Sequence, residues 1–528
     1  MIRRHVINAP GRNGLITERV YEQPDQLAWG LTLENAEVSL DGLIGVRKGW
    51  DLEATEATQD FLRLHEYIVD KDTSHILMTT TTDIWDDPTS PVDGDFSGGT
   101  TPTAGHWQFA NFNGHCVCAQ ASQTMQYWDG TTRISTKAAW KDDASINKPT
   151  TGNAIIAAWG RLWVTDSTET IVYWSQLLQD ITTASGDWSG TGSGSINTLH
   201  VWPDGLDRVT ALAQMHNRLL IFGTRSILVY TGVEDPGNDL ALEDVIRSGT
   251  QFRDSVVEAN DDVLYLADDG VRSVRRGLES DILPMTNLST QVHQQLTTEI
   301  RGVIAAPTSV RAAYNAADDM YYLKTGLSIV RSPLEYLVPR NGWWHFSFAQ
   351  LTPGSNPKAS KPRGFMADWA DMMWSSVDQK MYGINGDDIY SQSFTGYDDA
   401  GADIPFRWRS SWIEIAQGQS LNYKEVVLTV ATLRNFNIQL SWGTNFSAFN
   451  DHDSLTKLIS DDDIADAVIG TDHRQLHRVR FPISGSGSSL ALSIDVDVDG
   501  SAFAIQQIAI LYVGGSSYVT NDDSEVIA

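Results

Sequence analysis

The chain of 528 residues is long enough for two or three domains with sizeable cores, and its hydrophobic content of 41% is that of an ordinary globular protein. Acidic residues outnumber basic ones by 67 to 38, and the net charge of −29 argues against a protein that wraps nucleic acid or grips an anionic membrane. No apolar run approaches the roughly 20 residues that span a bilayer, and the N-terminus lacks the apolar region of a signal peptide, so we expect assembly in the cytosol.

Residues 1–50 differ from the rest of the chain and are predicted to form an N-terminal β segment. Pro10 to Gly14 is a flexible opening, because proline and glycine interrupt regular structure. The apolar stretches at 27–33 and 38–40 are typical of strands, and Asp41-Gly42 is a turn signal after them.

The stretch from Val209 to Gly232 shows the unit that residues 51–400 repeat. Its apolar runs at 209–213, 219–222 and 227–230 are short, rich in β-branched and aromatic residues, and separated by turn-forming residues. This pattern is typical of a buried antiparallel meander.

Seven copies of this unit follow one another at steps of 40 to 61 residues, with equivalent points at Leu77, Val117, Trp163, Leu220, Leu264, Tyr321 and Tyr382. A unit of three or four strands with this period predicts a β-propeller of about seven blades. One blade cannot bury both of its faces, whereas blades in a ring cover one another. The alternative is a pair of β-sandwiches whose hairpins only look periodic.

Two inserts, one helix and two cysteines stand out within this region. Residues 86–105 and 184–197 are rich in small and polar residues, so we expect exposed loops that serve as linkers or as an interface or gate. Residues 289–301 carry apolar side chains at four-residue steps, which favours a helix. Cys116 and Cys118 are expected as buried thiols on a strand, because their spacing does not suit a disulfide and few further zinc ligands lie nearby.

Residues 401–528 change character, because their apolar stretches are longer and several alternate with polar residues. This favours a C-terminal β-sandwich-like or jelly-roll-like domain. Within it, residues 461–469 are interpreted as a short helix and residues 518–525 as a loose acidic tail.

Asp495, Asp497 and Asp499, followed by Gly500, match the first half of an EF-hand calcium loop. The twelfth position, however, is Gln506 rather than a bidentate glutamate, and the neighbouring apolar residues alternate as in a strand. A strand with a solvated acidic face that ends in an Asp-Gly turn is therefore the competing interpretation.

Other candidate chemistry has an equally simple explanation. Trp343-Trp344 and the segment 369–374 suit either a platform for stacking sugars or the packing of blades. Asp261-Asp262 and Asp268-Asp269 fall in predicted turns, where aspartate is favoured. We find no nucleophile elbow, phosphate loop or zinc-protease motif, so no catalytic, metal or cofactor residue is assigned and no enzyme is expected.

A set of segments spread over roughly residues 12–430 shows a further similarity. They are Arg12 to Leu15, Leu31, Asn35, Gly42 to Ile44, Arg47 to Gly49, His216 to Gly223, Ile227 to Tyr230, Val263 to Leu266, Asp269 to Val271, Trp408 to Ile415 and Tyr423 to Val426. Together these segments resemble those of short-tailed bacteriophage tail nozzle proteins, also called tail tubular protein B or packaged-DNA stabilisation proteins.

The resemblance implies a homo-hexameric ring in the virion tail, assembled in the host cytoplasm, with a propeller in each subunit and the second, C-terminal β domain as its platform. Such a ring docks on a tail adaptor, supports tail fibres or tailspikes, and lets genomic DNA pass through its lumen without specific binding. An acidic lumen would repel the duplex within a Debye length of about 8 to 10 Å, so we expect part of the acid excess there. The alternative function is a secreted or surface β-propeller that binds or cleaves polysaccharide.

Overall fold

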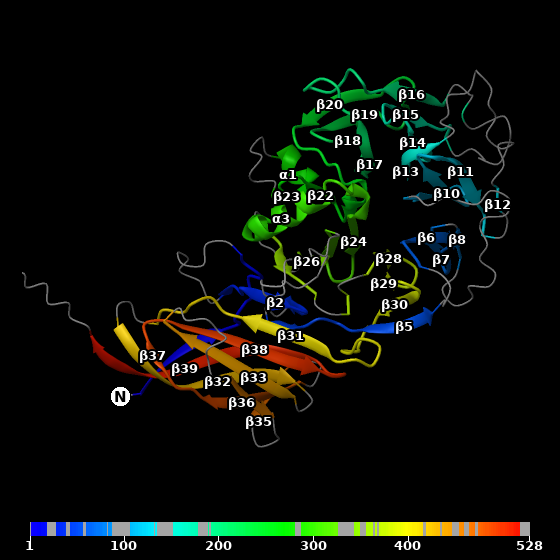
Figure 1. The fold of residues 1–528 in the computed structure, drawn as a ribbon. Coiled ribbons are helices and arrows are strands. Elements are labelled where there is room, and N and C mark those ends of the chain that lie inside the picture. The colour runs from blue at the N-terminus through cyan, green and yellow to red at the C-terminus, as the bar shows by residue number, and fades with distance from the viewer. Residues whose placement is uncertain are drawn as a thin grey trace, which may run out of the picture.

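A ring of small β-sheets stands on a β-sandwich in the computed structural model of the chain, which is the all-β architecture that the sequence predicts (Figure 1). The structure describes residues 2–17, 28–38, 43–55, 60–81, 83–86, 106–130, 133–134, 151–177, 188, 192–279, 287–325, 343–348, 355–362, 365–366, 369–415, 419–432, 436–445, 454–458, 464–469 and 474–517.

The first four blades each form one antiparallel sheet from a continuous stretch of chain. Blade 1 contains β6 (Arg63–Asp70), β7 (Thr73–Thr79) and β8 (Ile84–Trp85). Blade 2 contains β9 (Gln108–Phe112), β10 (His115–Gln120), β11 (Gln123–Trp128) and β12 (Arg133–Ile134). Blade 3 contains β13 (Gly152–Ala158), β14 (Arg161–Asp166), β15 (Ile171–Trp174) and β16 (Gly194–Asn197). Blade 4 contains β17 (Val209–Met215), β18 (Arg218–Gly223), β19 (Ile227–Thr231) and β20 (Ala241–Ile246).

The remaining blades include the point where the ring closes. Blade 5 contains β21 (Val257–Ala259), β22 (Asp262–Ala267) and β23 (Gly270–Ser273). Blade 6 contains β24 (Arg311–Asn315), β25 (Met320–Lys324), β26 (Trp343–Ser347) and β27 (Lys358–Ser360). Blade 7 contains β28 (Asp371–Ser375), β29 (Lys380–Asn385), β30 (Asp388–Gln392) and, from far earlier in the chain, β5 (Trp50–Thr55) as its outermost strand.

The predicted repeat points are confirmed, because each of the seven lies on the second strand of its sheet and is buried. Separate apolar clusters join neighbouring blades around the ring. Blades 5 and 6 share the largest cluster, and a further one joins blade 7 to blade 1 through Met78 and Ile384. The ring is therefore closed, with each blade buried between two neighbours.

The helices accompany blades 5 and 6. They are η3 (Arg253–Ser255), α1 (Val274–Glu279), η4 (Thr290–Val292), α3 (His293–Val303) and η5 (Pro307–Ser309). Together, η4 and α3 confirm the helix predicted at 289–301, which continues to Val303. Its buried residues Leu296, Ile300 and Val303 recur at steps of three and four, as a helix with one apolar face requires.

The sandwich consists of two sheets. The larger sheet contains β1 (Ile2–Asn8), β3 (Ala36–Val38), β4 (Ile44–Val46), β32 (Gln419–Thr432), β35 (Ile464–Ile469), β36 (Arg474–Pro482), β37 (Ser486–Gly487) and β39 (Phe503–Ser517). The smaller sheet contains β2 (Thr32–Glu34), β31 (Ile404–Arg409), β33 (Asn437–Thr444), β34 (Ser454–Leu458) and β38 (Leu490–Val498).

Both ends of the chain build this sandwich. Strand β1 pairs along its full length with β39, from Ile2 opposite Val513 to Asn8 opposite Gln507. Strand β2 pairs with β31, and β4 pairs with β39. The described strands within residues 1–50 thus complete the sheets of the C-terminal region, and β5 completes the propeller.

A buried polar joint connects the propeller to the sandwich. The Arg47 guanidinium donates two hydrogen bonds to the Asp399 carboxylate, at 2.8 and 2.6 Å, and a third to Asn35 at 3.0 Å. The largest apolar cluster also runs without a break from Trp344 of blade 6 to Trp408 of the sandwich. A large, partly apolar contact of this kind holds two domains at a fixed angle.

Two predictions of local structure were wrong. Residues 464–469 form strand β35 rather than a helix, because pairing with β36 overrides the local preference. Residues 194–197, predicted within a loop, form the outermost strand of blade 3. Most of the insert at 86–105 and all of the acidic tail at 518–525 lie outside the described residues.

Candidate functional site

Charged side chains from opposite sides of the propeller meet near its axis. The innermost strands are β6, β9, β13, β17, β21, β24 and β28, which contact one another around the ring. Arg63, Arg311 and Asp371 are the first residues of three of these strands, in blades 1, 6 and 7. Arg253 and Asp254 precede β21 of blade 5. We call these five residues the axial cluster.

The carboxylate of Asp254 is the centre of the axial cluster. It accepts hydrogen bonds from Arg63 at 2.8 Å, from Arg311 at 2.9 Å and from Arg253 at 3.1 Å. Gln108 of blade 2 donates to the same carboxylate at 3.2 Å. Because blades 1 and 5 lie across the ring from each other, this contact bridges the propeller axis.

In this cluster, burial and the neighbouring positive charges shift the pKa values of the carboxylates in opposite directions. Burial alone raises the pKa of Asp254, but the charges of Arg253, Arg63 and Arg311 outweigh it and hold the pKa well below its usual range. Burial raises the pKa of Asp371, and the charges of Arg311 and Arg63 limit that rise. The side chain of Asp254 is 1% exposed, so it is a fixed anion that holds three cations.

Arg253 extends the cluster to a further blade. Its guanidinium donates at 2.6 Å to the backbone carbonyl of Asn153 in blade 3 and at 2.7 Å to that of His106, just before blade 2. Hydrogen bonds therefore connect groups of blades 1, 2, 3, 5 and 6 in one network. Asp371 of blade 7 lies beside this network and accepts the backbone N–H of Leu64 in blade 1 at 3.0 Å. The arrangement stabilises the ring and closes its axis at this level.

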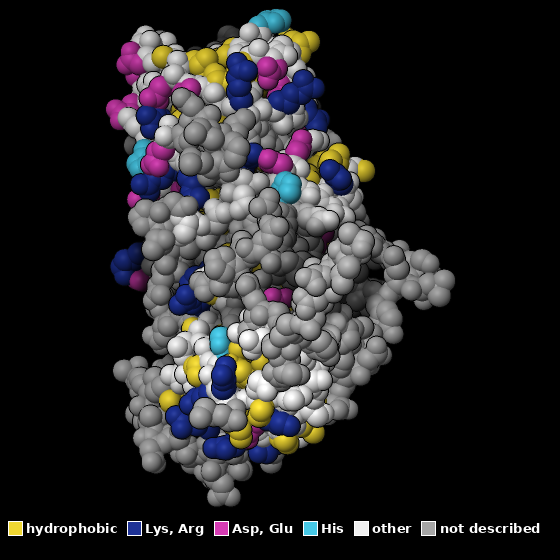
Figure 2. Space-filling view, turned by 90° about the vertical axis from the view of Figure 1, so that its left-hand side faces the viewer, with side chains coloured by type: hydrophobic (Ala, Val, Ile, Leu, Met, Phe, Trp, Pro, Cys, Tyr) yellow, Lys and Arg dark blue, Asp and Glu magenta, His cyan; other side chains and the backbone are white. Residues whose placement is uncertain are grey.

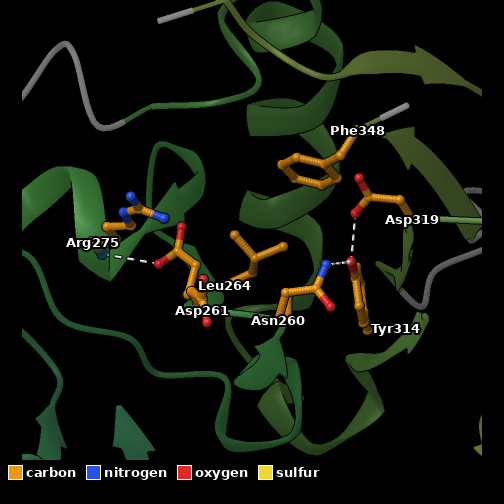
Figure 3. A pocket seen from close by; sticks show the side chains of 9 residues that line it. Asn260, Asp261, Leu264, Arg275, Tyr314, Asp319 and Phe348 are labelled. Carbon is orange, nitrogen blue, oxygen red and sulfur yellow. Dashed lines mark hydrogen bonds between the residues drawn. The ribbon is translucent and has the colours of Figure 1, made fainter. Parts of the chain in front are cut away.

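A pocket of about 270 Å³ lies between blades 5 and 6. Figure 3 shows Phe348, Asp319 and Tyr314 on one side of it and Arg275 and Asp261 on the other. The residues come from the turns after β21 and β24, from the start of α1 and from the end of β26. These turns reach the face of the ring opposite the axial cluster, because the strands that lead to them start at that cluster.

The polar groups of the pocket are already partly engaged. Asn260 donates to the Tyr314 hydroxyl at 2.6 Å, and that hydroxyl donates to the Asp319 carboxylate. Burial raises the pKa of Asp262, whose carboxylate accepts the Arg275 backbone N–H at 2.9 Å. With a Phe ring beside carboxylates, the pocket has the chemistry to hold a small polar ligand with one apolar face.

Around Asp495, Asp497 and Asp499 the structure has the strand and turn of the competing interpretation rather than the backbone of an EF-hand loop. Ile494, Val496 and Val498 are 0%, 2% and 0% exposed, so this segment is a regular strand whose aspartates point away from the core. Asp495 forms an ion pair with Arg407 of the neighbouring strand. Among the described residues, no group of three or more His, Cys, Asp or Glu has the arrangement of a metal site.

The other candidates are structural. Trp343, Trp344 and Trp369 are fully buried and wedge the blades, and Cys116 and Cys118 are buried free thiols on β10. Asp261, Asp268 and Asp269 lie in turns, as predicted, whereas Asp262 begins β22. In the part of the chain that the structure describes, no helix is long and apolar enough to cross a membrane.

Sequence reasoning missed the axial cluster and the pocket. A signal was present for the cluster, because Arg63, Arg311 and Asp371 each stand directly before an apolar strand of the repeat. Equivalent positions of several repeats converge on the axis of a propeller, so charged residues there had to meet. No comparable signal marks the pocket, because its sides come from turns of two different blades.

Comparisons with known proteins find no matching family model and no matching curated sequence. Solved structures with propeller folds do match. The WD40 domain of Neurospora crassa Pan2 matches at 7% identity and a TM-score of 0.37, covering 65% of this chain and 95% of its own. YCF48 bound to D1 peptide matches at 9% identity and a TM-score of 0.36, covering 65% of this chain and 94% of its own.

An exo-β-1,3-galactanase from Phanerochaete chrysosporium, solved with galactose, matches at 10% identity and a TM-score of 0.26. This match covers 78% of the present chain and 97% of the galactanase chain. The seven small sheets around one axis place the chain in the class of β-propeller proteins. The matches, at identities of 7 to 10%, add nothing beyond the fold.

Proposed function

We propose that this chain is a structural subunit of a short bacteriophage tail, and that six copies form the nozzle ring through which DNA leaves the virion. In this role the ring docks on the tail adaptor, supports fibres or tailspikes at its side, and helps to retain and then release the genome. The resemblance of residues 12–430 to tail nozzle proteins suggests the role, and three physical features of the chain support it.

The observation that carries the proposal is the closed axis of the propeller. Asp254 joins Arg63 and Arg311 from other blades at 2.8 and 2.9 Å, so a polymer cannot pass along this axis without breaking buried ion pairs. A conduit built from this protein must therefore lie outside the propeller. A ring of several copies provides such a channel along the axis that the copies share.

The joint between propeller and sandwich supports a mechanical role. The ion pair of Arg47 and Asp399 is almost completely buried, with side-chain exposures of 2% and 1%, and a continuous apolar core lies beside it. Two domains joined in this way keep their relative orientation under load, because opening the joint would expose both the charges and the apolar core.

The charge of the chain suits a channel that does not hold DNA. Six copies carry 174 excess negative charges, six times the 29 of one chain. Acidic groups on the lumen wall would repel phosphates over a Debye length of about 8 to 10 Å at physiological salt, so the duplex would slide rather than bind. We expect carboxylates to outnumber Lys and Arg on the lumen wall.

Native mass spectrometry and electron microscopy of the purified full chain test this proposal. The expected result is a hexamer and six-fold rings with a central channel. The proposal would be contradicted if the chain stayed monomeric at all concentrations and salt conditions. It would also be contradicted if antibodies against this chain did not label the tail of the virion. A basic lumen wall in such a ring would overturn only the sliding argument.

A second candidate function is favoured by the pocket of about 270 Å³ between blades 5 and 6, where Phe348 and the carboxylate of Asp319 lie on one side and Asp261 lies on the other. Such a site suits a sugar of a polysaccharide. Release of oligosaccharides from a polysaccharide panel, lost in Asp319→Asn and retained in Asp204→Asn on an exposed loop, would favour this function. No binding and no release across the panel would exclude it.

A further inference from the structure

The outer face of the larger sandwich sheet carries exposed apolar side chains. Ile2 and Val6 of β1 are 65% and 39% exposed. They stand in register with Val513 and Ala509 of β39, and Ala509 is opposite Val427 of β32. Residues directly opposite in an antiparallel sheet share one face. Val6, Ala509 and Val427 therefore line up across three strands, with the valines partly exposed and the small side chain of Ala509 buried between them in this row.

Arginines flank this row. Arg4 lies opposite Leu511, and Arg480 lies opposite Val427, so both share the face with the apolar row. Arg478 is two residues further along β36 and points the same way. The side chain of Arg480 is 70% exposed, and the carboxylate of Glu425 lies 3.9 Å from it. We call this surface the basic face.

A basic face is unusual on a chain whose net charge is −29. Figure 2 shows Lys, Arg and hydrophobic side chains gathered over the sandwich at the lower end of the molecule, whereas Asp and Glu side chains are more frequent over the propeller above. Exposed apolar groups bordered by charges of one sign mark a surface that binds a partner of the opposite sign.

The outer face of the smaller sheet has the opposite character. Asp495 and Asp497 of β38 alternate with buried residues and therefore point outward. Gln439 lies opposite Asp495, and the exposed Asp403 stands one residue before β31. Arg407 and Arg409 also lie on this face, and Arg407 pairs with Asp495 and Glu34. The acidic groups on it, including Asp403 and Asp497, outnumber these two arginines. We call this surface the acidic face.

We infer that the basic face of one copy binds the acidic face of the next copy, so that the sandwiches stack face to face around the ring. This inference rests on the proposed function and names the surfaces that would form its subunit contact. The two faces belong to opposite sheets of one sandwich and therefore point in opposite directions. A contact between two different patches generates a ring or a filament, depending on the rotation between copies.

Charge also favours the contact between a basic and an acidic face over a two-fold dimer in which the same face of both copies meets. Two basic faces would place Arg4, Arg478 and Arg480 of one copy against the same arginines of the other, and like charges oppose such a contact. Two acidic faces repel in the same way. Only the head-to-tail arrangement pairs opposite charges.

Charge reversal on each face tests the inference with the full chain. The basic-face variant carries Arg478→Glu and Arg480→Glu, and the acidic-face variant carries Asp403→Lys and Asp497→Lys. We expect each variant alone to associate at least about tenfold more weakly than the unmodified chain, measured by sedimentation velocity and native mass spectrometry. Association of the unmodified chain should weaken as salt is raised.

Mixing the two variants provides the decisive measurement. In the mixture, both faces of one variant are acidic and both faces of the other are basic, so alternating copies regain opposite charges at every contact. We expect equimolar mixing to restore the assembly of the unmodified chain, since a six-membered ring accommodates alternation. A merely destabilised variant would not be rescued by its partner.

The control is a charge reversal of the same size on blade 4, Arg225→Glu with Arg247→Glu, both exposed and far from the sandwich. This variant should assemble normally. If the unmodified chain forms hexamers and both face variants do so equally well, the inference fails while the proposed function stands. If the unmodified chain never assembles, both fail. If the basic-face variant keeps its rings but loses binding to duplex DNA in gel shifts, the face binds nucleic acid and the inference is overturned.

Discussion

The propeller and the sandwich bury their strands in different ways. Each of blades 1 to 6 is one continuous stretch of chain, and separate small cores join the blades, except that blades 5 and 6 share the core of the sandwich. The sandwich instead pairs Ile2 with Val513, at opposite ends of the chain, and has one apolar core. Local repeats thus assemble a ring whose centre is polar, whereas distant segments assemble a pair of sheets whose centre is apolar.

The vulnerable point therefore differs between the two regions. In the propeller it is the axis, where Asp254 compensates three buried or half-buried arginines. In the sandwich it is the interior, where residues such as Leu440 are completely buried. The experiments below test this contrast, beginning with the largest expected effect.

Asp254→Ala should lower the free energy of unfolding by about 3 to 5 kcal/mol, because Arg63, Arg253 and Arg311 would keep their charges without the buried anion that pairs with them. Urea unfolding followed by tryptophan fluorescence measures the change. Asp204→Ala, on an exposed turn, is the control and should stay within about 0.5 kcal/mol. An equally small effect of Asp254→Ala would show that the axis does not hold the ring.

Leu440→Ala should lower the free energy of unfolding by about 2 to 5 kcal/mol, because the shorter side chain loses apolar burial and leaves a cavity in the sandwich. Gln439→Ala, the exposed neighbour on the same strand, is the matched control. Comparison with Asp254→Ala sharpens the contrast between regions. Two separate unfolding transitions, each moved by one variant, indicate independent units, and a single shared transition indicates that the joint at Arg47 couples them.

The stability of the propeller should fall in acid through His345, which is 2% exposed on β26. Burial and the charge of Arg47 lower the pKa of His345 to about 3, against an ordinary value of 6.5. The unfolded chain therefore binds a proton that the folded chain excludes between these two pH values. The contribution of neutral His345 is complete above pH 6.5 and is lost as the pH falls towards 3, by about 2 kcal/mol at pH 5.

Replacing the titrating ring tests this pH dependence. In His345→Gln the free energy of unfolding should vary less between pH 7 and pH 5 than in the unmodified chain, as measured by urea unfolding at each pH. His200→Gln, at an exposed position, is the control and should keep the slope of the unmodified chain. An unchanged slope in His345→Gln would mean that other groups cause the acid sensitivity.

Arg275→Ala should have the smallest effect and change the free energy of unfolding by no more than about 0.5 kcal/mol. Arg275 and Glu279 form an ion pair at 3.1 Å with side-chain exposures of 55% and 63%, and water screens such pairs. Thermal unfolding compares this variant with Asp254→Ala. A loss of stability as large as that in Asp254→Ala would contradict the distinction between ion pairs at the surface and those at the propeller axis.

Much of the fold was predictable, because it depends on patterns within short stretches of chain. The runs at 209–213, 219–222 and 227–230 became β17, β18 and β19, and the repeat period indicated the number of blades. Alternation around Asp495 favoured a strand, as found, over a calcium loop. The helix expected at 461–469 was wrong, because residues 464–469 pair with the next strand, β36.

Alternation and repeat period determined by themselves that this protein is a β-propeller with a sandwich-like region, since the side chains that a strand must bury are neighbours in sequence. Only the tertiary structure decided that β1 and β5 of the N-terminal region complete two different sheets, that Asp254 meets arginines of other blades, and that the sandwich has a basic and an acidic face. Such pairings depend on contacts between residues that are up to about 500 positions apart, and local sequence patterns carry no information on which distant partners will meet.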